Sequence, residues 1–330
     1  MNTLKKRILT GDRPTGKLHL GHYVGSLKNR VKLQHDYDTF ILIADVQALT
    51  TNWEDPTQLG RDVREVAKDY LAVGIDPKEA NIFVQSMVPQ IAELTVFYSM
   101  MVSVNVLRHN PTIKTEAAQK GYTDMTYGFL GYPVSQTADI TFCNADLVPV
   151  GKDQMPHMEL TRKLVRRFND LYAPVFHEPE ALIQGLLIGL DGNTKMSKSL
   201  DNAIYLSDPA DEVMRKVRTA VTDPARIRKD DPGHPDICTV FAYQKEFAPE
   251  FACELEGACK AGQIGCVECK KRLAATLNAL LDPIREKRAY YDEHIDEVED
   301  ILKAGTLKAR EVGAETLAKV RDAMKINYFK

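Results

Sequence analysis

The stretch RILTGDRPTGKLHLGH, Arg7–His22, shows how the first part of this chain is expected to fold. Its first five residues form a short β-type run that ends at Gly11. A loop follows, and beyond it apolar residues recur at helical spacing, at Leu20, Val24, Leu27 and Val31. The segment therefore predicts a strand, a loop and a helix, with His19 and His22 at the start of that helix.

The following segments repeat the alternation of strand and helix. DTFILIADVQALT (38–50) is an almost continuous apolar run, as expected of a strand buried on both faces. EDPTQLGRDVREVAKDYLAVGID (54–76) predicts a helix with Asp55 as N-cap, a proline in its first turn and Gly74 at its end. ANIFVQS (80–86) is another short strand. This order is typical of an α/β fold with a Rossmann-type parallel sheet.

The pattern changes beyond about residue 205, where strands are not expected. We therefore predict a Rossmann-type catalytic domain over 1–204 and an all-helical C-terminal domain over 205–330. The helical segments are DPADEVMRKVRTAVTD (208–223), CKKRLAATLNALLDPIREKRAYYDEH (269–294) and KAREVGAETLAKVRDAM (308–324).

Composition limits the class of protein. The chain has 330 residues, 44% of them hydrophobic, and a formal net charge of −3, so any polyanionic partner must meet a local basic surface. No apolar run approaches the roughly 18 residues that cross a bilayer, and the N-terminal residues lack a signal-peptide pattern. We expect a cytoplasmic protein without membrane contact.

The two histidines lie where an open α/β sheet binds ligands, after the carboxyl end of its first strand. A helix N-terminus attracts phosphate through its unpaired N–H groups and its dipole. Gly16 and Gly21 allow the backbone to approach a ligand closely. His19 and His22 are therefore candidates for hydrogen bonding to phosphate, although a single histidine near a helix start is commonly only a cap or a surface residue.

A second motif, GLDGNTKMSKSLDN (189–202), contains Lys195 and Lys198. By itself such a run is typical of a solvated loop. Together with His19-x-Gly-His22, however, it resembles the HIGH and KMSKS signature pair of the class I aminoacyl-tRNA synthetases. The resemblance implies binding of ATP with Mg²⁺, activation of an amino acid with release of pyrophosphate, and transfer to tRNA, with both lysines moving onto the departing pyrophosphate.

The stretch YPVSQTADITFCNADLVPVGKDQMPHMELTR (132–162) resembles the tryptophan and tyrosine branch, subclass Ic, and the bacterial tryptophanyl-tRNA synthetases in particular. By this resemblance Asp139 accepts a hydrogen bond from the ring donor of the substrate, and indole N–H and phenol O–H both fit. The implied tryptophan-binding residues are Asp139, Gln154, Gln47, Gly11, Val148 and Val150. The implied ATP-binding residues are Arg13, Pro14, Thr15, Gly21, His22, Gly151, Lys152, Asp153, Lys195, Met196, Ser197, Lys198 and Ser199. The implied catalytic residues are His19, His22, Lys195, Lys198 and Lys114.

Some of these residues have simpler interpretations. Val148 and Val150 can equally be core residues of a buried strand. Lys114 can equally be a surface lysine without a role in binding. Gln47 departs from the resemblance, because many tryptophan enzymes carry histidine there. A tyrosyl-tRNA synthetase and a regulatory relative without catalysis remain alternatives, although intact histidine and lysine motifs favour an enzyme.

The helical domain carries local positive charge within an acidic chain, at Arg215, Lys216, Arg218, Arg226, Arg228 and Lys229. Basic helix surfaces are common, but the resemblance implies that this domain contacts tRNA(Trp) and that the protein is a homodimer. We expect the affinity for tRNA to fall steeply as salt rises.

Cysteine is concentrated in the same domain. Of the six cysteines, Cys143 is expected in the core of the catalytic domain, whereas five fall within residues 238–269. The spacing Cys238-x₂₀-Cys259-x₆-Cys266-x₂-Cys269 is typical of a tetrahedral thiolate site for zinc or iron–sulfur. GCVEC (265–269) resembles the pattern that binds a [4Fe–4S] cluster in a subset of bacterial tryptophanyl-tRNA synthetases. Cys253 is the alternative to Cys238 as the fourth ligand.

Overall fold

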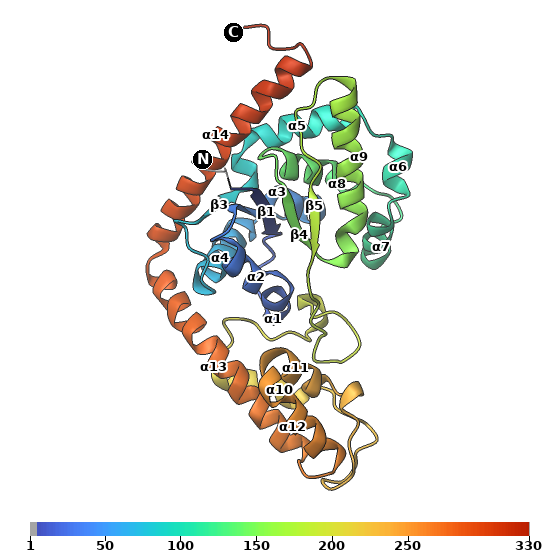
Figure 1. Cartoon of the computed structure of the whole chain (residues 1–330), viewed down its shortest axis with the longest axis vertical. Helices are drawn as coiled ribbons and strands as arrows, with labels where there is room; N and C mark the ends of the chain where they lie inside the picture. Colours follow the sequence, from blue (N-terminus) through green and yellow to red (C-terminus); the bar gives the residue numbers. More distant parts are fainter. Residues whose placement is uncertain (1–4, 330) are drawn as a thin grey trace. The chain divides into compact units, whose positions relative to one another are not determined.

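The computed structural model describes residues 5–329, with the side chain of Ser199 left out. Five parallel strands form one sheet in the order β3-β2-β1-β4-β5, as the predicted Rossmann-type fold requires (Figure 1). The chain runs outward from β1 to β3 and then crosses to β4 on the other side of β1. The order therefore reverses beside β1, which is where open α/β sheets bind ligands. The strands are β1 (Arg7–Asp12), β2 (Asp38–Ile43), β3 (Ala80–Val84), β4 (Leu147–Val150) and β5 (Glu180–Ile183).

The chain divides into two compact units, which are described separately. The sheet unit runs up to Gly16, over Lys28–Gly185 and from His294 onward, and the helical unit comprises Lys17–Leu27 and Leu186–Glu293. Helices of the sheet unit are α2 (Lys28–Leu33), α3 (Asp45–Asn52), α4 (Leu59–Ala72), α5 (Pro89–Ser99), α6 (Val104–Arg108), α7 (Pro111–Lys120), α8 (Tyr127–Thr141), α9 (Met155–Leu171) and α14 (Ile295–Ala323). Helices of the helical unit are α1 (Leu20–His22), α10 (Ala210–Thr219), α11 (Thr239–Phe247), α12 (Pro249–Lys260) and α13 (Cys266–Glu293).

This division differs from the predicted boundary between residues 204 and 205. Helix α14 follows the helical unit in sequence but packs on β3, where a β-carbon at Gly305 would overlap the carbonyl oxygen of Ile82. Thr306 Oγ1 also accepts a hydrogen bond from Val84 N at 3.3 Å. The absence of a side chain at Gly305 lets the helix lie directly against the edge strand, so α14 belongs with the sheet. The segment Lys17–Leu27 belongs with the helical unit instead.

The core of the sheet unit lies between the sheet and its helices. Three of its rings form an aromatic cluster, with centroids 5.3–6.4 Å apart: Phe40, Phe83 and Phe142. Cys143 is fully buried beside them, as expected for a core residue. Because the strands are covered by this core, they hold the loops at their carboxyl ends in a fixed frame.

Two local predictions were wrong. The apolar run 38–50 is not one strand, since β2 ends at Ile43 and α3 begins at Asp45, whose Oδ1 accepts from Val46 N at 3.0 Å. Asp55 is not the cap of the next helix, because its carboxylate holds Thr57 and α4 begins only at Leu59.

The other local predictions agree with the structure. β1 and β3 lie where strands were expected, and Gly74 stops α4 with a φ of +106°. The three predicted C-terminal helices correspond to α10, α13 and α14. In residues 5–329, none of the helices combines the length and the hydropathy that a membrane crossing needs.

Candidate active site

Asp139 of α8 is a buried carboxylate held by two glutamine amides. Gln47 Nε2 donates to its Oδ2 at 2.6 Å, and Gln85 Nε2 donates to its Oδ1 at 2.7 Å. The backbone N–H of Gln47 donates in turn to Gln85 Oε1 at 3.1 Å, which closes the network. Burial raises the pKa of Asp139 to about 7, although both amides act to lower it. Each carboxylate oxygen keeps a second lone pair, so Asp139 can accept a further hydrogen bond from a ring donor.

The other residues predicted for the tryptophan pocket include core residues. Val148 and Val150 are 5% and 8% exposed in β4 and belong to the main core, as their simpler interpretation required. Gly11 lies at the end of β1, and a β-carbon there would overlap the backbone of Leu42 in β2. Glycine is therefore needed for strand pairing at this position, whatever its role toward a ligand.

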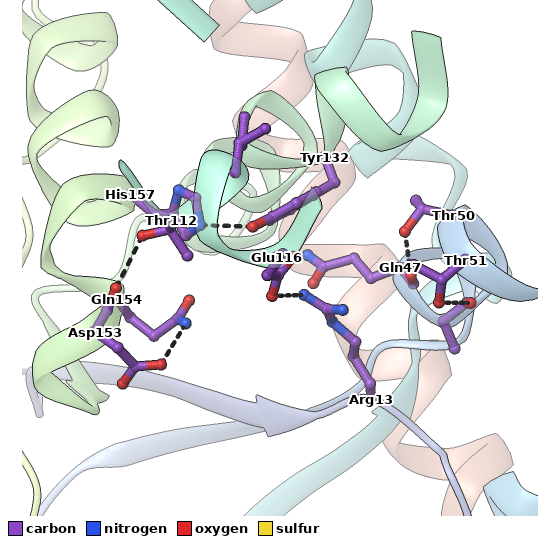
Figure 2. A network of polar contacts seen from close by, with 12 residues as sticks. Arg13, Gln47, Thr50, Thr51, Thr112, Glu116, Tyr132, Asp153, Gln154 and His157 are labelled. Atoms are coloured by element: carbon purple, nitrogen blue, oxygen red, sulfur yellow. Dashed lines mark hydrogen bonds and ion pairs between the residues drawn. The ribbon is translucent and has the colours of Figure 1, made fainter. Parts of the chain in front are cut away.

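A second polar network lies in the sheet unit (Figure 2). Tyr132 Oη and His157 Nε2 are 2.9 Å apart, and Arg13 Nη2 donates to Glu116 Oε1 at 3.2 Å. The Arg13 guanidinium lies 5.2 Å from the centroid of the Tyr132 ring. Of these four residues, only Arg13 was predicted as a site residue. Tyr132 could have been found, because it precedes Asp139 by seven residues, two turns earlier on the same face of α8.

The predicted nucleotide residues after β4 form a tight turn into α9. Lys152–Gln154 make one 3₁₀ turn, and Thr112 Oγ1 donates to Asp153 O at 2.9 Å. Gln154 Nε2 donates to Asp153 Oδ2 at 3.1 Å, and a β-carbon at Gly151 would lie 2.5 Å from Asp153 Oδ1. The Lys152 and Asp153 side chains are exposed, so they are available to a ligand.

The remaining predicted residues of the sheet unit differ in exposure. Thr15 and Lys114 are exposed, and Pro14 is buried. Lys114 lies in the first half of α7, whose start is capped by Asn110 Oδ1.

In the helical unit, His19 and His22 lie against each other with ring centroids 3.9 Å apart. His19 caps α1, because its Nδ1 accepts from Gly21 N at 3.1 Å, and its own backbone N–H donates to His22 Nδ1 at 3.2 Å. Gly21 N also lies 3.2 Å from Met196 Sδ, which joins the histidine segment to the lysine–serine loop. The two predicted motifs are therefore in direct contact.

The lysine–serine loop is organised by Asn202, a residue that the sequence analysis missed. Its Oδ1 accepts from Ser197 N at 2.8 Å, while its Nδ2 donates to Asp191 Oδ1 at 3.1 Å and to Thr194 Oγ1 at 3.2 Å. Asn202 is 4% exposed, whereas Lys195 is exposed. Lys198 begins a single 3₁₀ turn, and the side chain of Ser199 lies outside the described part of the chain.

Four cysteines of the helical unit lie near one another. Burial, and after it the charges of Cys238, Cys259 and Cys266, together raise the pKa of Cys269 to about 12. Cys253 is exposed and takes no part in this coupling. Within residues 5–329, however, no three His, Cys, Asp or Glu side chains form a group that could hold a metal ion, so the predicted metal site is not shown.

Arg226 faces this cysteine group. Its Nη1 lies 3.7 Å from Cys259 Sγ and 3.9 Å from Cys266 Sγ, and its Nη2 donates to Ile264 O at 2.5 Å. A β-carbon at Gly233 would lie 2.6 Å from Cys259 Sγ. The cysteine group is thus enclosed by a guanidinium and by a closely approaching backbone.

The basic residues predicted to meet tRNA are unequally available. Arg215 is bound by Glu212 at 2.6 Å and Lys216 by Asp208 at 2.6 Å, and Arg226 faces the cysteines. Arg218, Arg228 and Lys229 have exposed side chains.

Known proteins resemble the chain over nearly its whole length. The family model of class I tRNA synthetases for tryptophan and tyrosine matches residues 1–282. The tryptophan–tRNA ligase of Lactococcus lactis is 48% identical and that of Clostridium longisporum 50% identical, with 98–99% of each chain covered. The crystal structure of the Campylobacter jejuni tryptophanyl-tRNA synthetase with ADP and tryptophan superposes with a TM-score of 0.86 at 30% identity, covering 97% of this chain and 99% of that one.

Proposed function

Because this chain belongs to the class I tRNA synthetases for tryptophan and tyrosine, we propose that it is a tryptophan–tRNA ligase. It activates L-tryptophan with ATP and transfers the tryptophanyl group to tRNA(Trp). The observation that carries the choice of tryptophan is the similarity over nearly the whole chain to tryptophan–tRNA ligases, and Asp139 supplies a buried acceptor for the ring donor of the substrate. A protein with this task works in the cytoplasm, where tRNA is charged.

In the reaction, the carboxylate of tryptophan attacks the α-phosphate of ATP and pyrophosphate leaves. The protein needs to place charge rather than to form covalent bonds. We assign this to His19, His22, Lys195 and Lys198, since imidazole and ammonium N–H groups can donate to phosphate oxygens. Mg²⁺ prefers oxygen ligands and keeps much of its water, so it accompanies the triphosphate.

The contact between Gly21 and Met196 supports this assignment. It keeps the histidine segment and the lysine–serine loop together in one unit. Arg13, Lys114 and the turn after β4 are proposed to meet ATP, and Gln154 is proposed to meet the amino acid. The other residues named in the sequence analysis as ATP-binding or tryptophan-binding keep the roles that the resemblance implies.

Amino-acid-dependent exchange of pyrophosphate into ATP tests the function. Exchange with tryptophan, and none above background with tyrosine, is expected. Exchange with tyrosine alone would identify a tyrosyl-tRNA synthetase, and no exchange with either would indicate a regulatory relative without catalysis.

We infer that Cys238, Cys259, Cys266 and Cys269 bind a [4Fe–4S] cluster, with zinc as the alternative. Thiolate sulfurs are the donors that such a cluster takes, and Cys238, Cys259 and Cys269 pack against one small apolar cluster of the helical unit. Thiolates around a four-iron cluster also stand farther apart than those around a single ion. The positive charge of the Arg226 guanidinium would partly compensate the negative charge of a thiolate-bound cluster. The group would stabilise this part of the helical unit, because activation of tryptophan needs no redox step.

We further propose that the helical unit contacts tRNA(Trp) through its exposed basic residues and that the enzyme is a homodimer. Arg218, Arg228 and Lys229 are exposed, and cationic side chains of this kind bind the phosphate backbone.

A further inference from the structure

The partners of the buried Asn202 amide fix its orientation. A backbone N–H can only donate and an ionised carboxylate can only accept, so Oδ1 faces Ser197 N at 2.8 Å and Nδ2 faces Asp191 Oδ1 at 3.1 Å. Nδ2 also donates to Thr194 Oγ1 at 3.2 Å and lies 3.4 Å from Lys195 O. One side chain therefore holds residues on both sides of the turn that leads into the lysine–serine loop.

The backbone beneath this amide is also paired. Gly189 N donates to Thr194 O at 2.7 Å, and the next pair, Ile188 and Lys195, forms an antiparallel bridge. A β-carbon at Gly189 would overlap Asn202 Nδ2, so the amide packs directly on this paired backbone. The exposed Lys195 side chain consequently projects from an ordered segment whose position depends on Asn202.

The residues that follow Asn202 pair with the histidine segment. Leu20 N donates to Ile204 O at 2.9 Å, and Tyr205 forms an antiparallel bridge to His19. The rings of His19 and Tyr205 meet edge to face, with centroids 6.4 Å apart. The segment 202–205 therefore carries the lysine–serine loop at its first residue and the histidine segment at its last, within one compact unit.

This arrangement matters for the proposed reaction, because the imidazoles and the ammonium groups have to act on one triphosphate at the same time. Donors stabilise developing charge effectively only when they are held in place before the reaction. The distance between the two sets of donors is set by the chain segment that joins them, and Asn202 is the side chain that fastens the loop to that segment.

We propose that Asn202 is a positioning residue for formation of the adenylate. It contacts no substrate and acts by holding the segment that carries Lys195 and Lys198 in register with the histidines. This inference rests on the proposed function and adds to it a residue with a defined task. Because both lysines are assigned to the departing pyrophosphate, loss of Asn202 should change the rate and the handling of pyrophosphate, but not the affinity for the amino acid.

Three variants of the full-length chain separate the two halves of the amide. Asn202→Ala removes both halves. Asn202→Asp keeps an acceptor for Ser197 N but loses the donor and sets two carboxylates against each other. Asn202→Asp combined with Asp191→Asn, the swapped pair, exchanges donor and acceptor and restores their hydrogen bond at unchanged net charge.

Asn202→Ala should slow single-turnover formation of the adenylate by about 10- to 100-fold, because misplaced catalytic groups lose this much. In the reverse reaction, resynthesis of ATP from the bound adenylate, the KM for pyrophosphate should rise about tenfold. The dissociation constant of tryptophan should change less than about twofold, since its ring acceptor Asp139 lies in the other unit. Asn202→Asp should show the same pattern, and the swapped pair should recover most of the lost rate. Rapid-quench kinetics and calorimetry measure these quantities.

Asn193→Ala is the matched control, because Asn193 is an exposed asparagine of the same turn. It should leave the rate, the KM for pyrophosphate and the affinity for tryptophan at their wild-type values. A wild-type rate in Asn202→Ala would overturn the proposal. A loss of tryptophan affinity as large as the loss of rate would show a general structural defect and overturn it as well, and so would a swapped pair no faster than Asn202→Asp.

The activity of the wild-type chain separates this proposal from the proposed function. If the wild type activates tyrosine instead of tryptophan, the choice of substrate is wrong, and the same variants are tested with tyrosine and the same expected outcomes. If it activates neither amino acid, both proposals fall. If it activates tryptophan and Asn202→Ala does so at the same rate, only the role of Asn202 is wrong.

Discussion

Gln47 and Asp139 are 92 positions apart in the sequence, and a 2.6 Å hydrogen bond joins the amide of one to the carboxylate of the other. Gln47 stands where many tryptophan enzymes carry histidine, and an amide cannot take up a proton as an imidazole does. Asp139 is therefore the group of this pair whose ionisation governs how the pocket responds to pH.

The affinity for tryptophan is expected to rise as pH increases through about 7. Burial moves the pKa of Asp139 from 3.8 to about 7, and the ionised carboxylate is the stronger acceptor for an indole N–H. Below pH 7 binding must first displace a proton, so the dissociation constant should increase toward tenfold per pH unit. Calorimetry between pH 5.5 and 8.5 measures this. Asp139→Asn should bind weakly throughout and show no such trend, whereas a flat wild-type profile would contradict the assignment.

The raised pKa of Asp139 also makes the free energy of unfolding depend on pH. Because the folded chain holds the Asp139 proton to a higher pH than the unfolded chain, this group favours folding most below pH 3.8. That contribution is lost as pH rises through about 7.

Gln47→Leu should move the midpoint of this pH dependence upward. The Gln47 amide stabilises the ionised form of Asp139, and a hydrogen bond to a charged group contributes about 1.5–3 kcal/mol, which corresponds to one to two pKa units. Gln85→Leu should act in the same direction because it removes the other amide. An unchanged midpoint in both variants would show that the amides do not control the ionisation of Asp139.

Lys195→Ala and His22→Ala should each slow formation of the adenylate about 10²- to 10³-fold while leaving tryptophan binding nearly intact. A contact to charge that develops in the transition state has this effect on kcat. Single-turnover formation of tryptophanyl-adenylate gives the rate, and calorimetry gives the affinity. Lys17→Ala, an exposed lysine of the same unit, is the control. A variant that activates tryptophan at the wild-type rate would exclude that residue from catalysis.

Protein purified without oxygen should be brown and contain about four iron and four sulfide ions per chain. Cys238→Ser should abolish the colour, and Cys253→Ser should not, because Cys253 is exposed and outside the coupled group. Absorption near 400 nm and iron analysis measure both. Colourless protein with about one zinc ion per chain would show that the site binds zinc instead of a cluster. Loss of colour only in Cys253→Ser would show that Cys253, and not Cys238, is the fourth ligand.

Binding of tRNA(Trp) should weaken steeply with salt, and Arg228→Ala should lower the slope of log K against log salt by about 1. Arg215→Ala should change it less, because Arg215 is already bound by Glu212 at 2.6 Å. Filter binding over a range of salt concentrations tests the pair. Equal slopes for the wild type and Arg228→Ala would remove Arg228 from the phosphate-binding surface.

The parallel α/β class of the sheet was predictable from the sequence, because the short strands β1 and β3 were recognisable and alternate with helical segments. The change from β2 to α3 was not, since both elements lie in one apolar run and hydrophobicity alone does not separate a buried strand from a buried helix. Asp45, a residue that favours helix starts, was the available signal.

The candidate site was predictable where motifs carry it. Asp139 and the two signature motifs were found by their local patterns, but Gln85, Glu116 and Asn202 were missed. Each of these three residues forms hydrogen bonds to partners that are distant in the sequence or lie across a loop. The partner of Glu116, for example, is Arg13, which lies 103 positions earlier. Long-range pairing of this kind leaves no periodic trace in the sequence.

The close fit of Gly305 against Ile82 has a consequence for the synthesis of the protein on the ribosome. Strand β3 is one of the two edge strands of the sheet, and the helix that covers it is synthesised only after the whole helical unit has been made. During that interval the nascent chain presents an uncovered strand edge, which is a surface prone to pairing with other chains. Chaperone demand and losses to aggregation should therefore fall mainly on chains interrupted before α14, and much less on chains that have passed it.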